Sequence, residues 1–415
     1  MTSRQRVLAA LNHQPTDKVP VDFGAMRCSG IHALVYNQLT RHLRISSPGA
    51  KVYDVYQMLA EPEEEVLEYF ESDVVQLMRL RPALGLRIDR YVPGKLTDGS
   101  KAHFPAEYSP RSENGCLVLR DKNGLAIAKM PEAGFYFEKI NPPLISASSC
   151  ADIDAFSFRS LDADEEEWLA RESKRLARTD KAVLGSFGGA FLEAGNAWFG
   201  MEEFFVRLLK DPKLVKHFFA RLLEAYIADF DRYREAVGDR VQIIQVSDDL
   251  GCQSGPLISE ELYCRLIKPF HRRLYGYIRE NSDMKLLLHS CGSIAAFIPH
   301  LVEMGVQAVN PVQYRARDMD TGRLKKEFGR EITFWGGGCD TQRILVSGSP
   351  EEVRAEAERQ IKILAPGGGF VFTQVHNIQP GVPPENIVAL YEAARNRSTA
   401  GDWLGRRPVR RKDGL

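Results

Sequence analysis

Short apolar runs alternate with helical segments along most of this 415-residue chain. We read eight of these runs as strands: 19–24, 72–80, 182–191, 241–249, 285–293, 308–313, 332–340 and 369–377. Many are continuous apolar blocks rather than alternations of apolar and polar residues, which favours parallel strands buried on both faces. Helices are expected between them, and also over 30–43 and 53–70. The pattern predicts an α/β fold, namely a (β/α)8 TIM barrel.

One segment between the second and third strands breaks the alternation. Proline and glycine recur from 81 to 144, and two β-prone runs, 116–121 and 125–130, flank Asn123-Gly124. An Asn-Gly pair between such runs predicts a hairpin. We therefore expect a barrel domain over 1–396 with a β-rich insertion at 81–144, which could form a lid or a homodimer interface. The basic end, 397–415, is predicted to be a separate tail.

Charge and cysteine content narrow the class of protein. Lys plus Arg equals Asp plus Glu at 55 each, so no basic field predicts a nucleic-acid partner. No apolar run approaches the roughly 18 residues that a membrane helix needs. Seven cysteines form no dense framework, and the first residues read as a helix rather than a signal peptide. These features predict a reducing, cytoplasmic location without a membrane partner.

The fifth strand ends with two residues that could bind a metal. It reads KLLLHSCGS, and His289 and Cys291 share one face because residues two apart in a strand point the same way. An imidazole and a thiol aimed together form half of a zinc site, although an isolated pair of this kind is also compatible with simple packing. Barrel enzymes place their chemistry at the carboxyl ends of the strands. Other polar residues expected there are Asp22, Asp248, Asp249, Asn310, Gln313, Cys339, Asp340, Gln374, His376 and Asn377.

The third strand ends in a glycine-rich turn. Phe187 precedes Gly188 and Gly189, which either let a ligand approach the backbone or simply make a turn. We count Phe187 among the substrate-binding candidates. The segment lacks the Lys and Ser/Thr of a phosphate loop, and no nucleotide-binding fingerprint occurs elsewhere. The sequence therefore argues against NAD and S-adenosylmethionine as cofactors.

Three segments resemble the uroporphyrinogen decarboxylase superfamily: 4–24 (RQRVLAALNHQPTDKVPVDFG), 289–293 (HSCGS) and 370–393 (FVFTQVHNIQPGVPPENIVALYEA). The middle segment is similar to the zinc-dependent methyltransferase branch, whose enzymes move methyl groups between corrinoid proteins and thiols. The resemblance covers about 2–396. It implies a barrel, a zinc ion, a corrinoid (cobalamin) carried by a partner protein, and a small methylated substrate or thiol.

This chain departs from the metal-binding pattern of that branch at one position. The branch has H-x-C followed by a distant cysteine, whereas alignment on the shared ending places His376 there. The resemblance thus implies His289, Cys291 and His376 as ligands, with Cys339 as an alternative or fourth ligand. Asp248, Asp249, Asp340 and His376 are the candidate catalytic residues. The candidate substrate-binding residues are Asp22, Arg27, Phe187, Asn310, Gln313, Gln374 and Asn377.

Two other functions stay open. A cofactor-free decarboxylase of the uroporphyrinogen type would use Asp73, His376 and Arg27, although the Arg-Gln-Ala-Gly-Arg run typical of that branch is reduced here to Arg27 alone. A substrate with many carboxylates needs several well-placed cations. The other alternative is a barrel that binds a corrinoid without catalysis.

Overall fold

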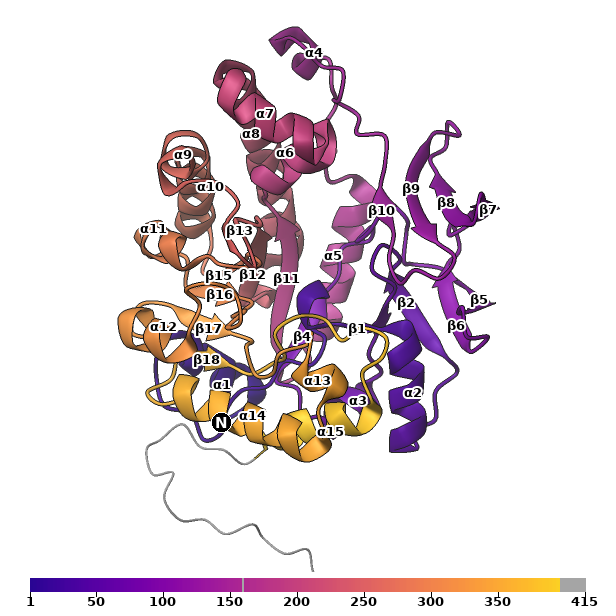
Figure 1. The fold of residues 1–415 in the computed structure, drawn as a ribbon, viewed down its shortest axis with the longest axis vertical. Helices are drawn as coiled ribbons and strands as arrows, with labels where there is room; N and C mark the ends of the chain where they lie inside the picture. The colour runs from indigo at the N-terminus through magenta and orange to yellow at the C-terminus, as the bar shows by residue number, and fades with distance from the viewer. Residues whose placement is uncertain (159, 396–415) are drawn as a thin grey trace, which may run out of the picture.

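A curled parallel sheet forms the centre of the computed structural model, which describes residues 1–158 and 160–395 (Figure 1). Its seven strands are hydrogen-bonded in the order β18-β17-β16-β15-β12-β11-β4. Their bounds are β4 (Val74–Leu77), β11 (Ala182–Gly188), β12 (Ile243–Ser247), β15 (Lys285–His289), β16 (Ala308–Asn310), β17 (Thr333–Trp335) and β18 (Phe370–Val371). Seven of the eight predicted strands are therefore present in a mixed α/β fold.

The first predicted strand lies between the two edges of this sheet. Val21 forms a parallel bridge with Phe372, just after β18. On its other side, the amide of Asp73, just before β4, donates to the carbonyl of Val21 at 2.7 Å. The segment around Val21 thus connects β18 to β4, and the curled sheet has a TIM-barrel-like shape.

The sheet buries apolar side chains on both faces, as the continuous runs predict. Leu287 belongs to a small inner cluster, whereas Leu286 and Leu288 belong to the larger cluster that includes the helices. The inner cluster also contains Val74, Ala182, Leu184, Ile243, Ala308, Trp335 and Val371, together with Val7, Ala10 and Leu11 of α1 (Ser3–Leu11). The register pairs Ser247 with His289 and His289 with Asn310, so these side chains reach the same level at the carboxyl ends of their strands.

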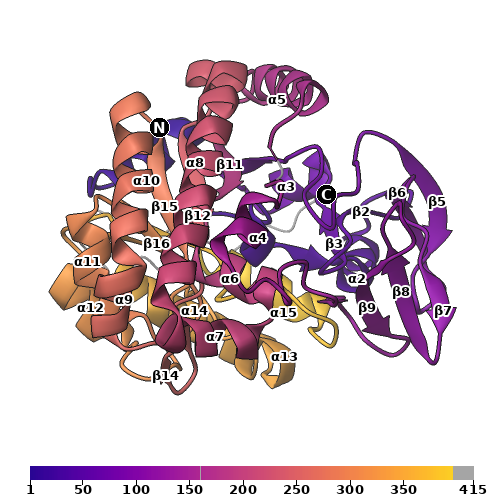
Figure 2. The ribbon, with the colours of Figure 1, turned by 90° about the horizontal axis from the view of Figure 1, so that it is seen from above.

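Helices surround the sheet in both views (Figures 1 and 2). They are α5 (Ala163–Leu176), α6 (Leu192–Phe199), α7 (Met201–Lys210), α8 (Pro212–Val237), α9 (Glu260–Leu266), α10 (Lys268–Asn281), α11 (Ile298–Glu303), α12 (Thr321–Phe328), α13 (Ile344–Ser347), α14 (Pro350–Leu364) and α15 (Pro384–Glu392). Short helices α2 (Ala33–Leu43), α3 (Glu64–Tyr69) and α4 (Cys150–Asp154) precede them. Over the described residues, none of the helices combines the length and the apolar character needed to cross a bilayer.

Two further sheets lie to one side of the barrel-like sheet (Figure 2). The five-stranded one contains β1 (Ile31–His32), β2 (Ala50–Asp54), β3 (Leu59–Glu61), β5 (Tyr91–Lys95) and β6 (Lys101–Pro105). The four-stranded one contains β7 (Arg111–Glu113), β8 (Cys116–Arg120), β9 (Ala126–Pro131) and β10 (Glu138–Lys139). Strands β8 and β9 pair antiparallel around Asn123-Gly124, so the predicted hairpin is confirmed.

One prediction for this side of the molecule needs correction. The helix expected over 53–70 is wrong in its first half, where β3 pairs with β1 and β2 and only α3 is helical. Within the segment 81–144, β5 and β6 join a sheet whose other strands, β1, β2 and β3, precede β4. That this segment is an insertion stays a prediction. The predicted tail, 397–415, lies outside the described residues.

Candidate metal site

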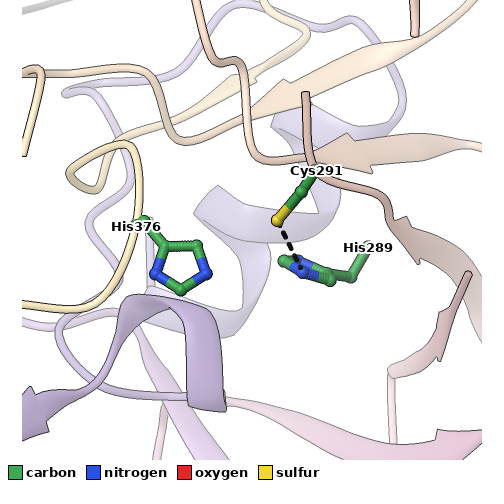
Figure 3. A group of neighbouring side chains, drawn as sticks. All are labelled: His289, Cys291 and His376. Carbon is green, nitrogen blue, oxygen red and sulfur yellow. Dashed lines mark hydrogen bonds between the residues drawn. The ribbon is translucent and has the colours of Figure 1, made fainter. Parts of the chain in front are cut away.

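His289, Cys291 and His376 come together at the carboxyl end of the sheet (Figure 3). His289 ends β15, Cys291 follows in the next turn, and His376 lies in the loop after β18. One donor atom from each lies within 4.8 Å of the other two. The Cys291 sulfur is 3.4 Å from Nε2 of His289, and the two imidazole centroids are 6.2 Å apart. Two segments 85 residues apart in the sequence therefore supply one group of metal-capable atoms.

The side-chain amide of Asn310 fixes the orientation of His289. Asn310 Nδ2 donates to the carbonyl of Trp335 at 2.9 Å, so its Oδ1 is an acceptor. That oxygen lies 2.8 Å from Nδ1 of His289, which must therefore carry the proton. The lone pair of His289 is then on Nε2, the atom that faces Cys291. Metal-binding histidines are commonly held in this way by a hydrogen bond to the other ring nitrogen.

Asn377 fixes the orientation of His376 through the same kind of hydrogen bond. Asn377 Nδ2 donates to Gln57 at 2.7 Å, while its Oδ1 accepts from Gln379 Nε2 at 2.6 Å. The same oxygen lies 3.0 Å from Nδ1 of His376. His376 accordingly donates through Nδ1 and keeps its lone pair on Nε2. Both imidazoles are thus prepared to bind a cation through Nε2.

Burial and one carboxylate set the protonation of the group. Burial lowers the pKa of His376 to about 4, so its imidazole is neutral at pH 7. Burial, followed by the negative charge of Asp249, raises the pKa of the Cys291 thiol well above its usual range. Asp249 Oδ1 also accepts the backbone N–H of Cys291 at 2.7 Å and lies 3.8 Å from His289 Nε2. The thiol keeps its proton until a cation displaces it.

The donor set fits a zinc ion. Zinc prefers nitrogen and sulfur ligands, and catalytic sites use three protein ligands with a fourth position left for water or substrate. Two imidazoles and one thiol, each with a fixed neighbour, match that requirement. Gln313 further shapes the site because its Oε1 accepts the N–H of Gly292, the residue after Cys291.

A cavity of about 430 Å³ adjoins the three residues. Cys291 and His376 line it, and so do Gln313 and Asn377. The other lining residues come from loops after β12, β16, β17 and β18: Gln253, Tyr314, Arg315, Asp340, Thr341, Gln342, Val375 and Gln379. A small ligand therefore has space beside Cys291 and His376.

Cys339 and Asp340 follow β17 but differ in position. Cys339 is fully buried and packs in the apolar core, and it is not part of the group that surrounds the candidate metal position. Its expected role as a ligand is therefore not supported by the geometry. Asp340 does line the cavity, where it forms an ion pair with Arg315 at 3.0 Å.

Asp248 has a set of contacts that the sequence did not suggest. Its carboxylate accepts the backbone N–H groups of Phe191, Leu192 and Glu193 at 2.8–3.0 Å, at the start of α6. Its Oδ2 also lies 3.0 Å from Nε2 of the fully buried His271. Asp248 thus holds the first turn of α6 in place, and its oxygens are occupied by the protein itself.

Three candidate substrate-binding residues lie away from the cavity. Asp22 is fully buried and accepts from Trp335 Nε1, the N–H of Ala25 and Ser29 Oγ, while burial raises its pKa to about 6. Gln374 is also buried, and it donates to the carbonyl of Ser29. Phe187 faces outward from β11 and packs on Tyr226, Phe230 and Tyr233 of α8. These positions correct the expectation that every strand end points into one site.

Two residues of the decarboxylase alternative are also placed. Asp73 precedes β4, at the amino end of the sheet, where it is buried and pairs with Arg6 at 2.6 Å. Arg27 pairs with Asp54 and donates to the carbonyl of Pro82. Asp73 therefore lies at the end of the sheet opposite His376.

Glu193 is a residue that sequence reasoning missed. It is the second residue of α6, and burial followed by the nearby charge of Asp249 raises its pKa to about 8. One of its carboxylate oxygens is buried without a hydrogen-bond partner among the described residues. The sequence signal that could have identified Glu193 as a site residue is its position shortly after the Gly188-Gly189 turn, at the end of the third predicted strand.

Known proteins match this chain in sequence and in fold. The family model described as uroporphyrinogen decarboxylase (URO-D) matches residues 133–397. A curated uroporphyrinogen decarboxylase of Thioalkalivibrio sulfidiphilus is 26% identical over 187 residues, covering 45% of this chain and 49% of the relative. One of Prochlorococcus marinus is 24% identical over 265 residues, covering 62% and 70%. The chain spans about half the length of the first of these relatives.

A solved structure shares the fold over nearly the whole chain. It is described as a methyltransferase from Methanosarcina mazei, and it superposes with a TM-score of 0.59 at 18% identity, covering 95% of this chain and 98% of that one. The resemblance of the fold supports the TIM-barrel-like architecture. Because the family model spans well over half of the sequence, the chain belongs to the uroporphyrinogen decarboxylase (URO-D) family.

Proposed function

We propose that this protein is a zinc-dependent methyltransferase that moves a methyl group between a small methylated substrate or thiol and a corrinoid protein. The main support for this proposal is the group of three donor atoms from His289, Cys291 and His376. Two side-chain amides, those of Asn310 and Asn377, direct Nε2 of the two imidazoles toward the Cys291 thiol. A general base needs only one imidazole in this tautomer, whereas two imidazoles that converge on a thiol form a set of donors for one cation. The methyltransferase fold of the solved relative supports the same function.

Each residue of the site would have a separate role. A bound zinc ion would act as a Lewis acid on the sulfur or oxygen of a ligand at its open position. His289, Cys291 and His376 would hold the ion, and the Cys291 proton would leave as it binds. Asn310 and Asn377 keep the two imidazoles in the ligating tautomer. The adjoining cavity would receive the small substrate, and the corrinoid would approach from the carboxyl end of the barrel.

The second candidate function is a cofactor-free decarboxylase, because the curated relatives carry that name. The structure offers it less support. Asp73 lies at the amino end of the sheet and is already paired with Arg6. The cavity beside His376 is lined by one arginine, which suits a small ligand better than a tetrapyrrole with many carboxylates.

Elemental analysis and a transfer assay test the proposal together. The protein purified without chelator should contain about one equivalent of zinc, and His289→Ala and Cys291→Ala should each lose it. The zinc-loaded protein should demethylate methylcobalamin in the presence of a small thiol, and chelation should stop the reaction. Turnover of uroporphyrinogen that survives chelation would instead support the decarboxylase.

A further inference from the structure

Lys325 is a partly buried amine without an acidic partner at the amino end of the sheet. Its side chain leaves α12 and crosses Gly329, where an added Cβ would lie 2.5 Å from its Cδ. Nζ donates to the carbonyl of Gly368 at 2.6 Å, and within residues 1–158 and 160–395 no carboxylate forms an ion pair with it. Gly368 precedes β18, whose other end leads to the candidate metal site. The amine therefore lies at the end of the sheet opposite the metal-binding candidates.

His13 lies against the same glycine turn. It follows α1, and an added Cβ on Gly369 would lie 2.6 Å from its Nδ1. The N–H of Gly369 donates to the carbonyl of Ala10 at 2.9 Å, so the end of α1 and this turn are joined. His13 Nδ1 is buried and has no hydrogen-bond partner in the part of the chain that the structure describes. Buried N–H groups without a partner are rarer than acceptors without one, so we assign the lone pair to Nδ1.

Burial favours the uncharged forms of both side chains. It lowers the pKa of Lys325 from 10.5 to about 8, because no opposite charge offsets the loss of hydration. Burial, followed by the positive charge of Lys325, also lowers the pKa of His13. At neutral pH Lys325 is thus a free amine more often than an exposed lysine is, and a neutral imidazole lies at the same turn.

Other lysines have different partners. Lys18 and Lys51 each form an ion pair with a glutamate, which occupies the ammonium group. Lys181 has surroundings similar to those of Lys325, because it is partly buried and its Nζ donates to a backbone carbonyl, that of Ser72. Among the described residues, however, no imidazole contacts Lys181. The nearby imidazole therefore distinguishes Lys325 from a lysine that is otherwise held in the same way.

We propose that Lys325 is a site of Nε-acylation by an activated acyl donor, either an acyl phosphate or a thioester. The amine nitrogen attacks the acyl carbon and forms a C–N bond, while the C–O bond to phosphate or the C–S bond of the thioester breaks and phosphate or thiolate leaves. The proton lost by the amine passes to His13 Nδ1 and from there to water. Lys325 is partly exposed, so the donor can reach it from solvent. No step involves the candidate metal site, so the modification is independent of the proposed function.

Acetyl phosphate and acetyl-coenzyme A test the two classes of donor separately. The full chain is incubated with each at neutral pH, and peptide mass spectrometry follows the acetylation of Lys325 and of Lys181, the internal reference. We expect Lys325 to react about tenfold faster than Lys181 with at least one donor, because an imidazole takes up its proton. The donor that gives the larger ratio identifies the chemical class that modifies the protein. A Lys325 rate no higher than that of Lys181 with both donors would overturn the proposal.

Two histidine variants test the role of the imidazole. His13 has a φ of 54°, and asparagine tolerates this left-handed conformation better than most residues, so His13→Asn removes the imidazole with little backbone strain. It should lower the Lys325 rate to about that of Lys181, whose own rate should not change. His42→Asn is the matched control, because it removes an exposed imidazole from α2 and should leave both rates unchanged. A Lys325 rate that is undiminished in His13→Asn would overturn the role of His13, and the wild-type ratio decides the acylation site even if that variant does not fold.

Discussion

Replacing Asn310 with alanine should weaken metal binding without removing a ligand. The change deletes the 2.8 Å hydrogen bond that holds the proton on Nδ1 of His289. The imidazole can then rotate and adopt the other tautomer, which removes the lone pair from Nε2. Loss of such a supporting bond typically lowers metal affinity 10- to 100-fold. We therefore expect the zinc Kd to rise by about that factor, or about 1.4–2.7 kcal/mol.

The same change also affects folding, so the assay needs a matched control. Asn310 is fully buried and donates to the Trp335 carbonyl, and leaving that oxygen unpaired costs about 1–3 kcal/mol of stability. Asn386 is equally buried and donates to the carbonyls of Leu345 and Gly348, away from the three metal-binding candidates. Asn386→Ala should lower stability similarly but leave the zinc Kd unchanged.

The measurement is competition for zinc against a chromophoric chelator, paired with thermal unfolding of the metal-free proteins. We expect that only Asn310→Ala changes the Kd, while both variants lower the unfolding temperature. Equal Kd values for Asn310→Ala and Asn386→Ala would refute this expectation, because the amide of Asn310 would then have no role at the metal. A complete loss of zinc would show instead that Asn310→Ala disrupts the site as a whole.

Three further predictions follow from the buried residues around the site. Cys339→Ala should keep the wild-type zinc content in elemental analysis, because this thiol packs in the core away from the donor group; loss of zinc would restore it as a ligand. The pKa of Asp22 is raised to about 6, so the folded state holds its proton more tightly than the unfolded state and stability falls as pH rises from about 4 to 6. By pH 7 the wild type should lose about 3 kcal/mol relative to Asp22→Asn, and a difference in unfolding free energy that does not vary with pH would contradict this. Asp248→Ala should lower the free energy of unfolding, measured in denaturant, by about 3–5 kcal/mol, because the start of α6 and the buried His271 lose their shared acceptor. A decrease below about 1 kcal/mol would mean that water replaces the carboxylate.

The sequence was most informative where a local pattern determines the structure. Continuous apolar runs specify strands buried on both faces, and the seven strands of the central sheet confirm that inference. The spacing of His289 and Cys291 places both at one strand end because alternate residues share a face. The Asn123-Gly124 hairpin is likewise a local signal.

Features that depend on contacts across the fold could not be predicted in this way. The segment 59–61 reads as part of a helix, but it becomes β3 because β1 and β2 pair with both of its sides. Asp248 looks like a site residue at a strand end, yet its carboxylate faces the amino terminus of α6. The pairing of His376 with Cys291 came from the resemblance, since no local pattern links residues so far apart in the chain.

The hydrogen bonds of His376 bear most directly on the choice between a metal ligand and an acid. A general acid at this position would need to hold its proton on the nitrogen that faces the substrate. Asn377 instead accepts from Nδ1, on the side away from the other two donors, and its own amide is fixed by Gln57 and Gln379. Nε2 is left as a lone pair beside a second lone pair, that of His289, and a thiol. The Cys291 thiol can donate to only one of these lone pairs, whereas a single cation could accept both, and this supports the metal-ligand role over the acid.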